Sequence, residues 1–317
     1  MTLSEACPHY QGKLDEAEPL FREALVSARE KFGDNHYNTT VSMNNMVVVL
    51  KDMGKLGEAE PLLREALARV RETLGDKHLK TLKTINNMAK FLLDQVWVSA
   101  PLPGIDPLLS PIRANQGESS EAESLFIEAL SGMRDTLGDR HPTTLNAIDE
   151  RAHALKAKGR LAEAEPLFRE LVDGVRETMG DKDPNTLAAA NNLATLLHSR
   201  GKMAEADALF RGTLAGMRET LGDKNSRTLA CIIDMSSYLL DRGKTDEARP
   251  LIHEALAVSR ETLGEHDPRT LLAINNMASL MCAQGNHAAA EPLLREAMTV
   301  QRDALVSGRV PLLARNV

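Results

Sequence analysis

The stretch from Asp181 to Gly222, DKDPNTLAAANNLATLLHSRGKMAEADALFRGTLAGMRETLG, decides how this chain folds, because copies of it recur on both sides at a step of 42 residues. Ala follows the marker glycine of each copy at the fifth position, and Leu follows it at the eighth. The marker glycines, with 21 extra residues before the third, are Gly12, Gly54, Gly117, Gly159, Gly201, Gly243 and Gly285. A fixed period of roughly 20 to 50 residues is typical of solenoids and related arrays. The sequence therefore predicts a fold made by stacking one small unit on the next.

Each copy predicts two helices joined by a short turn at Gly-Lys. In the quoted copy the first helix spans residues 186–199 and the second spans residues 204–221. An apolar stripe at i, i+3, i+4 and i+7 marks the first helix, as at Ile274, Met277, Ala278 and Met281. Asp183 before Pro184 predicts an N-cap, and Gly222 predicts a left-handed residue that closes the second helix.

Composition favours protein or peptide partners. The formal net charge of -7 and the 3% aromatic content argue against a nucleic-acid surface or an anionic membrane surface. The three cysteines are too scattered for a disulfide framework or a zinc site, which favours a reducing, cytoplasmic location. No apolar run approaches the roughly 18 residues of a membrane span, and the N-terminus lacks the pattern of a signal peptide.

The sequence predicts no enzyme. Most histidines recur once per repeat in the loops between repeats, which indicates repetition of a turn rather than a shared site. No HExxH, GxSxG, paired CxxC or phosphate-binding Gly-Lys-Ser/Thr motif is present. We therefore expect no catalytic residues, no metal, no cofactor and no small-molecule substrate.

The repeat resembles a known family. The helix pair with small residues at these offsets is similar to the tetratricopeptide repeat, and the 42-residue step with NN[LM]A, GKxxEAEPLxREAL and RETLGDKHP resembles its kinesin light chain type over Gly12 to Leu305. The resemblance implies an all-α, right-handed superhelical solenoid whose first helices line a concave groove that holds an extended peptide. The chain departs from the pattern at Asp149-Glu150, where four other copies have Asn-Asn, and it shows no heptad coiled coil ahead of the repeats.

Three regions follow from this register. Residues 1–11, which include Pro8, are expected to form an irregular or truncated half-repeat, and residues 12–305 the array of six helix pairs that follows it. Residues 306–317 are a non-repeat tail. Residues 96–116 are a Pro-rich insertion whose removal restores the period, and we expect an extended loop there. Two interpretations stay open: a functional arm carrying Trp97, or a retained intron, which would make the tail an artefact as well.

Candidate binding residues come from the second position of each Asn pair. At 100° per residue this position lies about 150° from the apolar stripe, so we expect it to face the groove. The position holds Asn45, Asn87, Asn192 and Asn276, with Glu150 and Asp234 in the two departing copies. An amide both donates and accepts, so a row of Asn could hold a peptide backbone without reading its sequence. The alternative is that these side chains hydrogen-bond neighbouring repeats.

Charged residues share the predicted groove face. Lys83 and Lys90 lie with Asn87, and His153 lies near the same face, which predicts a modest basic stretch that would favour acidic peptides. Ordinary solvated helix faces are an equal alternative, because exposed charges are common and individually weak. Arg recurs in seven of seven copies and Thr in six of six without an evident role.

These patterns predict a non-catalytic adaptor or scaffold that binds peptide segments in the concave groove of the array. The alternative is a structural or regulatory repeat fragment of a larger signalling or kinesin light chain-like cargo-binding protein.

Overall fold

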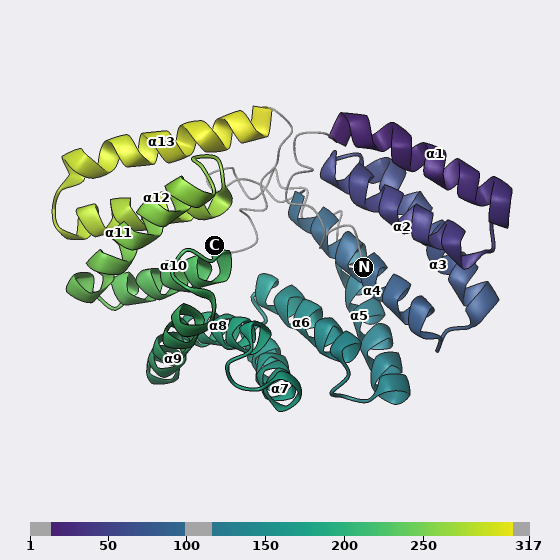
Figure 1. Cartoon of the computed structure of the whole chain (residues 1–317), viewed down its shortest axis with the longest axis horizontal. Coiled ribbons are helices and arrows are strands. Elements are labelled where there is room, and N and C mark those ends of the chain that lie inside the picture. The colour runs from purple at the N-terminus through teal and green to yellow at the C-terminus, as the bar shows by residue number, and fades with distance from the viewer. Residues whose placement is uncertain (1–13, 99–115, 307–317) are drawn as a thin grey trace. The chain divides into compact units, whose positions relative to one another are not determined.

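The protein is built from helices that follow one another in pairs. The structure, a computed structural model, describes residues 14–98 and 116–306, and in these residues it contains thirteen α-helices and no strand. They are α1 (Leu14–Phe32), α2 (Tyr37–Asp52), α3 (Leu56–Leu74), α4 (Leu79–Val98), α5 (Gln116–Leu137), α6 (Pro142–Ala157), α7 (Leu161–Met179), α8 (Pro184–Ser199), α9 (Met203–Leu221), α10 (Ser226–Asp241), α11 (Thr245–Thr262), α12 (Pro268–Ala283) and α13 (His287–Val306), as labelled in Figure 1. The predicted all-α array of helix pairs is confirmed.

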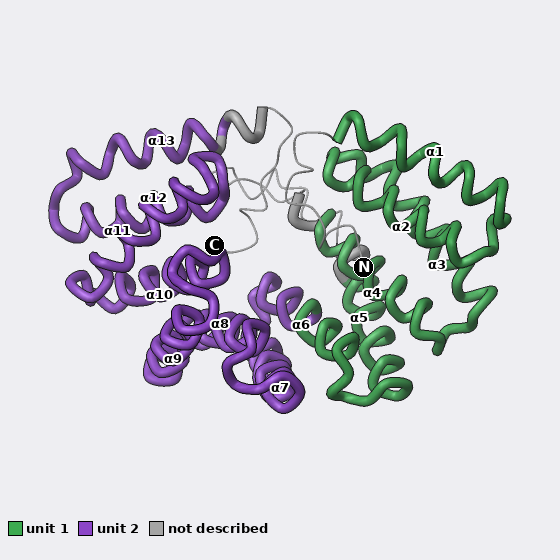
Figure 2. Tube along the Cα trace, in the orientation of Figure 1, with its two compact units in different colours: residues 1–150 green, residues 151–317 purple. Residues whose placement is uncertain are grey.

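The chain divides into two compact units, residues 1–150 and residues 151–317, drawn in different colours in Figure 2. Helix α6 contributes to both. In the first unit α1 packs on α2, α2 on α3, α3 on α4 and α4 on α5. In the second unit consecutive helices from α7 to α13 pack in the same way, and α10 also contacts α8 and α12. First helices of successive repeats therefore stack side by side in the second unit.

Local signals place the helix ends where the sequence predicts them. The Asp183 side chain accepts a hydrogen bond from the Asn185 backbone N–H at 2.7 Å, and Pro184 opens α8. Gly222 has a φ of 81° after α9, a conformation that L-residues rarely adopt. Helix α4 differs from the expectation, because it continues to Val98 and so includes the first three residues of the predicted insertion. The rest of the insertion up to residue 115, the predicted half-repeat 1–11 and the predicted tail 306–317 lie outside the described residues, apart from Val306, at which α13 ends.

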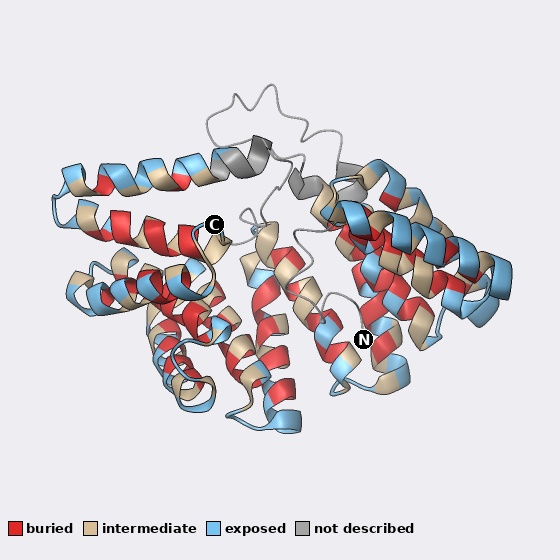
Figure 3. Cartoon of the chain, turned by 45° about the horizontal axis from the view of Figure 1, so that its top comes forward, coloured by how far each residue is buried: buried red, intermediate tan, exposed pale blue. Residues whose placement is uncertain are grey.

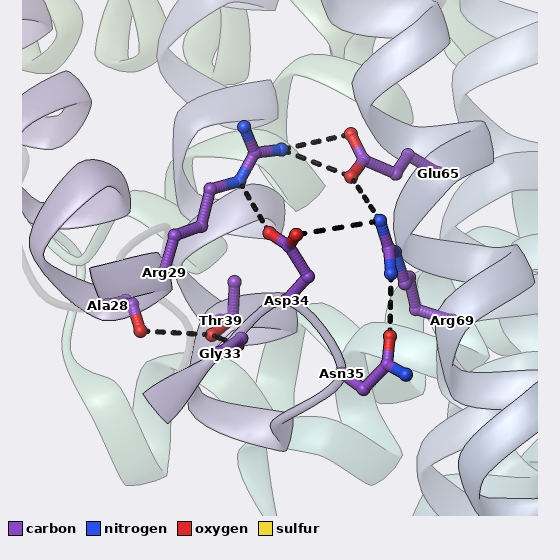
Figure 4. A network of polar contacts seen from close by, with 8 residues as sticks. All are labelled: Ala28, Arg29, Gly33, Asp34, Asn35, Thr39, Glu65 and Arg69. Carbon is purple, nitrogen blue, oxygen red and sulfur yellow. Dashed lines mark hydrogen bonds and ion pairs between the residues drawn. The ribbon is translucent and has the colours of Figure 1, made fainter. Parts of the chain in front are cut away.

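In five copies the recurrent Thr ties the first helix to the helix before it, and the exception is Thr144, whose buried hydroxyl has no hydrogen-bond partner among the described residues. Thr39 donates from its hydroxyl to the carbonyl oxygen of Gly33 at 2.7 Å, and it also lies 3.3 Å from that of Ala28 (Figure 4). Thr270 makes the same 2.7 Å bond to the carbonyl of Gly264. The last carbonyls of a helix have no partner within it, so a fixed donor here satisfies one of them. This explains a position that the sequence alone left without a role.

In several copies the recurrent Arg joins second helices of successive repeats, whereas Arg176 has Gly212 at the partner position and bonds Asp173 and Asp181. Arg29 on α1 donates to both carboxylate oxygens of Glu65 on α3, at 3.0 and 3.1 Å, and its Nε lies 3.4 Å from Asp34 (Figure 4). Arg218 and Arg260 repeat the bridge with the Glu that lies 36 residues ahead. The equivalent pair across the insertion is Arg71 with Glu128.

Buried residues gather on the sides of the helices that face their neighbours (Figure 3). The recurrent Ala at the fifth position after the marker glycine is 0% exposed at Ala59, Ala164, Ala206 and Ala248. In most copies the recurrent Leu is less buried than a core position: Leu209 is half-buried and Leu20 is 65% exposed, although Leu125 is only 9% exposed. The next residue fills the core instead, as at Leu63, Phe168, Phe210 and Ile252, none more than 1% exposed. The core of the second helix is therefore centred one residue further along the chain than the recurrent Leu indicates.

Candidate functional site

The predicted site residues lie on the first helices of the repeats, α2, α4, α6, α8, α10 and α12. On α4 the residues Leu82, Ile85 and Met88 are almost completely buried, whereas Lys83 and Asn87 are exposed. Lys90 is half-buried on the same helix, and Asn45 is half-buried on α2. Residues at i, i+4 and i+7 share one face of a helix, so Lys83, Asn87 and Lys90 form one strip along α4. We call these three residues the α4 strip.

Glu150 on α6 binds Lys90, the last residue of the α4 strip. Its carboxylate accepts from Lys90 Nζ at 3.0 Å and from Asn86 Nδ2. Asn86 is the first Asn of its pair and is only 8% exposed. Lys90 therefore meets a carboxylate of its own chain, while no residue in the described ranges forms a hydrogen bond or an ion pair with the side chain of Lys83 or Asn87.

In the second unit the predicted residues form hydrogen bonds with residues of neighbouring repeats. Asn192 Nδ2 on α8 lies 3.1 Å from His153 Nε2 on α6, and the His153 ring packs edge-on against Phe168 at 5.1 Å. Asp234 on α10 accepts from Asn191 Nδ2 on α8 at 2.6 Å. The side chains of Asn192, His153 and Asp234, which the sequence predicted to contact a peptide, are therefore engaged in contacts within the chain.

Asn276 on α12 is held in the same manner. Its Nδ2 donates to the carbonyl oxygen of Ile233 at 3.2 Å and to Ser236 Oγ at 3.0 Å. Its Oδ1 accepts from Ser237 Oγ at 3.1 Å. Both halves of the amide are therefore used by α10, the first helix of the preceding repeat.

The first Asn of each pair is the residue that sequence reasoning missed. Asn86 and Asn191 are 8% and 7% exposed, and each donates to the acidic residue at the second-Asn station of the next repeat. The sequence did contain a signal for this contact. Glu150 and Asp234 replace Asn at the positions that face an amide donor from the first helix of the preceding repeat. Among the described residues the other amide atom, Oδ1, of both Asn86 and Asn191 has no hydrogen-bond partner.

A cluster of titratable groups surrounds Asp234. Burial raises the pKa of Asp234, and the hydrogen bond from Asn191 opposes this rise. Burial lowers the pKa of Lys156 on α6, and the charge of Asp234 opposes this fall. On α8, His198 Nε2 lies 3.1 Å from Asp241 on α10. The first helices of the second unit therefore carry a row of polar side chains, most of which form hydrogen bonds or ion pairs within the protein.

No group of three or more His, Cys, Asp or Glu side chains in the described part of the chain is arranged to hold a metal ion. Within the same residues no helix is long and apolar enough to cross a membrane.

Comparisons with known proteins agree with this architecture. The tetratricopeptide repeat family matches residues 2–69, 40–95, 112–177, 143–219, 185–252 and 228–303. No curated protein matches the chain. A crystal structure described as "Podosopora anserina putative kinesin light chain nearly identical TPR-like repeats" is 23% identical with a TM-score of 0.55, over 72% of this chain and 98% of that one. The apo form of the quorum sensor NprR from B. thuringiensis has a TM-score of 0.55 at 12% identity, over 91% of this chain and 82% of that one.

At these identities the two structures establish a shared fold alone. The family match covers most of the chain and rests on the repeat itself. Proteins of this fold generally mediate protein–protein interaction, and the fold is typically non-enzymatic. The chain belongs to the tetratricopeptide repeat family.

Proposed function

We propose that this protein is a non-catalytic adaptor or scaffold that binds extended peptide segments of protein partners, and that the α4 strip is a contact point for acidic segments. The observation that carries the proposal is the pair Lys83 and Asn87, which are exposed on a helix whose neighbouring residues 82, 84, 85, 86, 88 and 89 are buried. Between residues 82 and 89, where every other residue of α4 is buried, the helix presents an ammonium group and an amide to solvent.

The contrast between the two units supports this location. In the second unit the side-chain amides of Asn192 and Asn276 form hydrogen bonds with residues of other repeats. Asn87 has no such partner among the described residues, so its donor and acceptor can meet the backbone N–H and C=O of a ligand. Asn45 lies at the same station one repeat earlier and extends the row of amides onto α2.

Charge supports the choice of an acidic segment. Lys83 adds a positive charge that forms no ion pair with a described carboxylate, whereas Lys90 forms an ion pair with Glu150. Rim charges of this kind act on association rate and on specificity more than on affinity, and salt screens them. A cytoplasmic location, in which such partners would be met, stays a prediction.

The test uses fluorescein-labelled peptides rich in Asp and Glu, with basic peptides of equal length for comparison, measured by fluorescence anisotropy. We expect the acidic peptides to bind more tightly, and the double variant K83E/N87A to weaken their binding about tenfold or more at low salt. The matched control is Lys77→Glu, which reverses an exposed charge in the turn before α4. Circular dichroism should be unchanged in both variants, and equal affinity of K83E/N87A and K77E for acidic peptides would disprove the site.

A further inference from the structure

Three first helices begin at a histidine whose ring accepts a hydrogen bond. His36 is the N-cap of α2, and its Nδ1 accepts from the backbone N–H of Asn38 at 3.1 Å. The same bond recurs at the start of α4 and of α6, where the acceptors are His78 and His141, at 3.2 and 3.1 Å. The first N–H groups of a helix have no partner within it, so each ring satisfies one of them.

Helices α8, α10 and α12 begin at a side-chain oxygen instead. The caps are Asp183, Asn225 and Asp267, and each accepts from the backbone N–H two residues later at 2.7 to 2.9 Å. The three histidine caps lie in the first of the two units drawn in Figure 2, and these three oxygen caps lie in the second. The two units therefore differ in the chemistry that starts their first helices.

The histidine caps depend on protonation in a way that the oxygen caps do not. An imidazole accepts at Nδ1 only while it is neutral and carries its proton on Nε2. Protonation removes this acceptor and places a positive charge at a helix N-terminus, which disfavours one. The unfolded chain has no such bond to lose, so the stability from these caps is present while the rings are neutral and is lost as the pH falls from about 8 to 5, where imidazoles titrate. Carboxylates titrate well below this range and amides do not titrate, so the second unit keeps its caps.

The acid two residues before each histidine cap forms an ion pair with the recurrent Arg of the preceding helix. These pairs, with Nε to carboxylate distances of 3.2 to 3.4 Å, are Asp34 with Arg29, Asp76 with Arg71 and Asp139 with Arg134. From the following second helices, Glu65 and Glu128 bond the first two of these arginines, and Arg69 lies 3.9 Å from Asp34. The basic side chains in or beside the three turns are Lys31, Lys77, Lys80 and Arg140. The Asp of each turn is therefore neutralised by an arginine, so it offers a protonated ring little stabilisation.

We propose that acidification loosens the starts of α2, α4 and α6 in the first unit and leaves those of α8, α10 and α12 closed, because His36, His78 and His141 cap the first three helices. Opening of each of these three first turns should become about fivefold more favourable, as for the loss of an N-cap. At α2 the Phe32 ring is stacked on His36 with the centroids 4.9 Å apart, which favours a cation, so this helix should respond least. The effect does not depend on peptide binding at the α4 strip.

Hydrogen exchange of the full chain, followed by mass spectrometry at about pH 7.5 and about pH 5.5, tests this. Each exchange rate is divided by the intrinsic rate at the same pH, because intrinsic exchange itself changes with pH. We expect protection at the first turns of α4 and α6 to fall about fivefold at the lower pH, and protection at the first turn of α2 to fall by less. Protection at the first turns of α8, α10 and α12 should stay as it is.

Exchanging the cap residues separates this effect from other titrations. In the triple variant H36N/H78N/H141N each cap becomes an amide of the kind that Asn225 provides for α10, so the three first turns should keep their protection at the lower pH. Asn225→His should transfer the sensitivity to α10, whereas the control His266→Asn, which changes an exposed histidine beside the Asp267 cap, should change nothing. Equal loss of protection in both units, no loss in either, or a loss that the triple variant retains in full would overturn the proposal.

Discussion

Arg29 and Glu65, which are 36 residues apart in the chain, are joined by two hydrogen bonds of 3.0 and 3.1 Å from one guanidinium nitrogen to both carboxylate oxygens. The same nitrogen-to-carboxylate contact recurs between Arg218 and Glu254 and between Arg260 and Glu296, at 2.6 and 2.7 Å. A repeat protein is stabilised by the sum of its repeats and of the contacts between neighbours, so a bond that recurs in several of its steps adds to the stability of the array several times.

The first prediction concerns the size of this bond. The side chains of Arg29 and Glu65 are 39% and 34% exposed, so solvent screens them and the pair should contribute little more than a surface ion pair. A double-mutant cycle with Arg29→Met and Glu65→Gln should give a coupling energy of about 0.5–1 kcal/mol in urea unfolding at low salt. The coupling should fall in high salt. The control cycle is Arg295 with Glu291 in one helix, where a coupling equal to that of Arg29 and Glu65 would show that bridging two repeats adds nothing.

The second prediction distinguishes two adjacent residues of α9. Phe210 is 0% exposed and its ring lies 5.3 Å from that of Tyr238, whereas the recurrent Leu209 is only half-buried. Phe210→Ala should cost about 3–5 kcal/mol of unfolding free energy, because it leaves a cavity in a packed core. Leu209→Ala should cost about 1–2 kcal/mol, because part of its surface is already in water. Chemical denaturation of both variants measures the difference, and an equal cost would contradict the placement of the core at Phe210.

Sequence periodicity predicted the helices well and the roles of polar residues poorly. The helix over residues 186–199 and that over 204–221 were predicted to within two residues, because a cap, a turn glycine and an apolar stripe are all local signals. The contact between Asn191 and Asp234 joins residues 43 apart on different helices, and a helical wheel of one helix contains no such information. For the same reason the recurrence of Arg29 and Thr39 was visible, but their partners were not.

The last prediction uses two carboxyl groups of the second unit whose pKa values move in opposite directions. Burial alone would raise the pKa of Glu165, but hydrogen bonds from Lys202 at 2.8 Å and Arg169 at 3.0 Å outweigh it and lower the pKa from 4.5 to about 2. A lowered pKa stabilises the fold above the ordinary value of 4.5, and this stability is lost as the pH falls from 4.5 towards 2. Glu165 is only 6% exposed, but the side chains of Arg169 and Lys202 are 42% and 38% exposed, so solvent screens these ion pairs and limits the contribution to about 1–2 kcal/mol.

Asp234 should behave in the opposite way. Burial raises its pKa from the ordinary value of 3.8, so the carboxyl group has no effect on stability below that value, destabilises the fold increasingly as the pH rises from 3.8 to the raised pKa, and has a constant effect above it. Asp234→Asn keeps an acceptor for Asn191 Nδ2 and removes the buried charge, so it should raise the unfolding free energy at pH 7 by about 1–2 kcal/mol. Glu165→Gln should instead lower that free energy at pH 7 and remove part of the loss below pH 4.5. Urea unfolding from pH 3 to pH 8 measures both variants beside the unchanged chain, and destabilisation of the Asp234→Asn protein at pH 7 would show that the Asp234 charge is favourable where it lies.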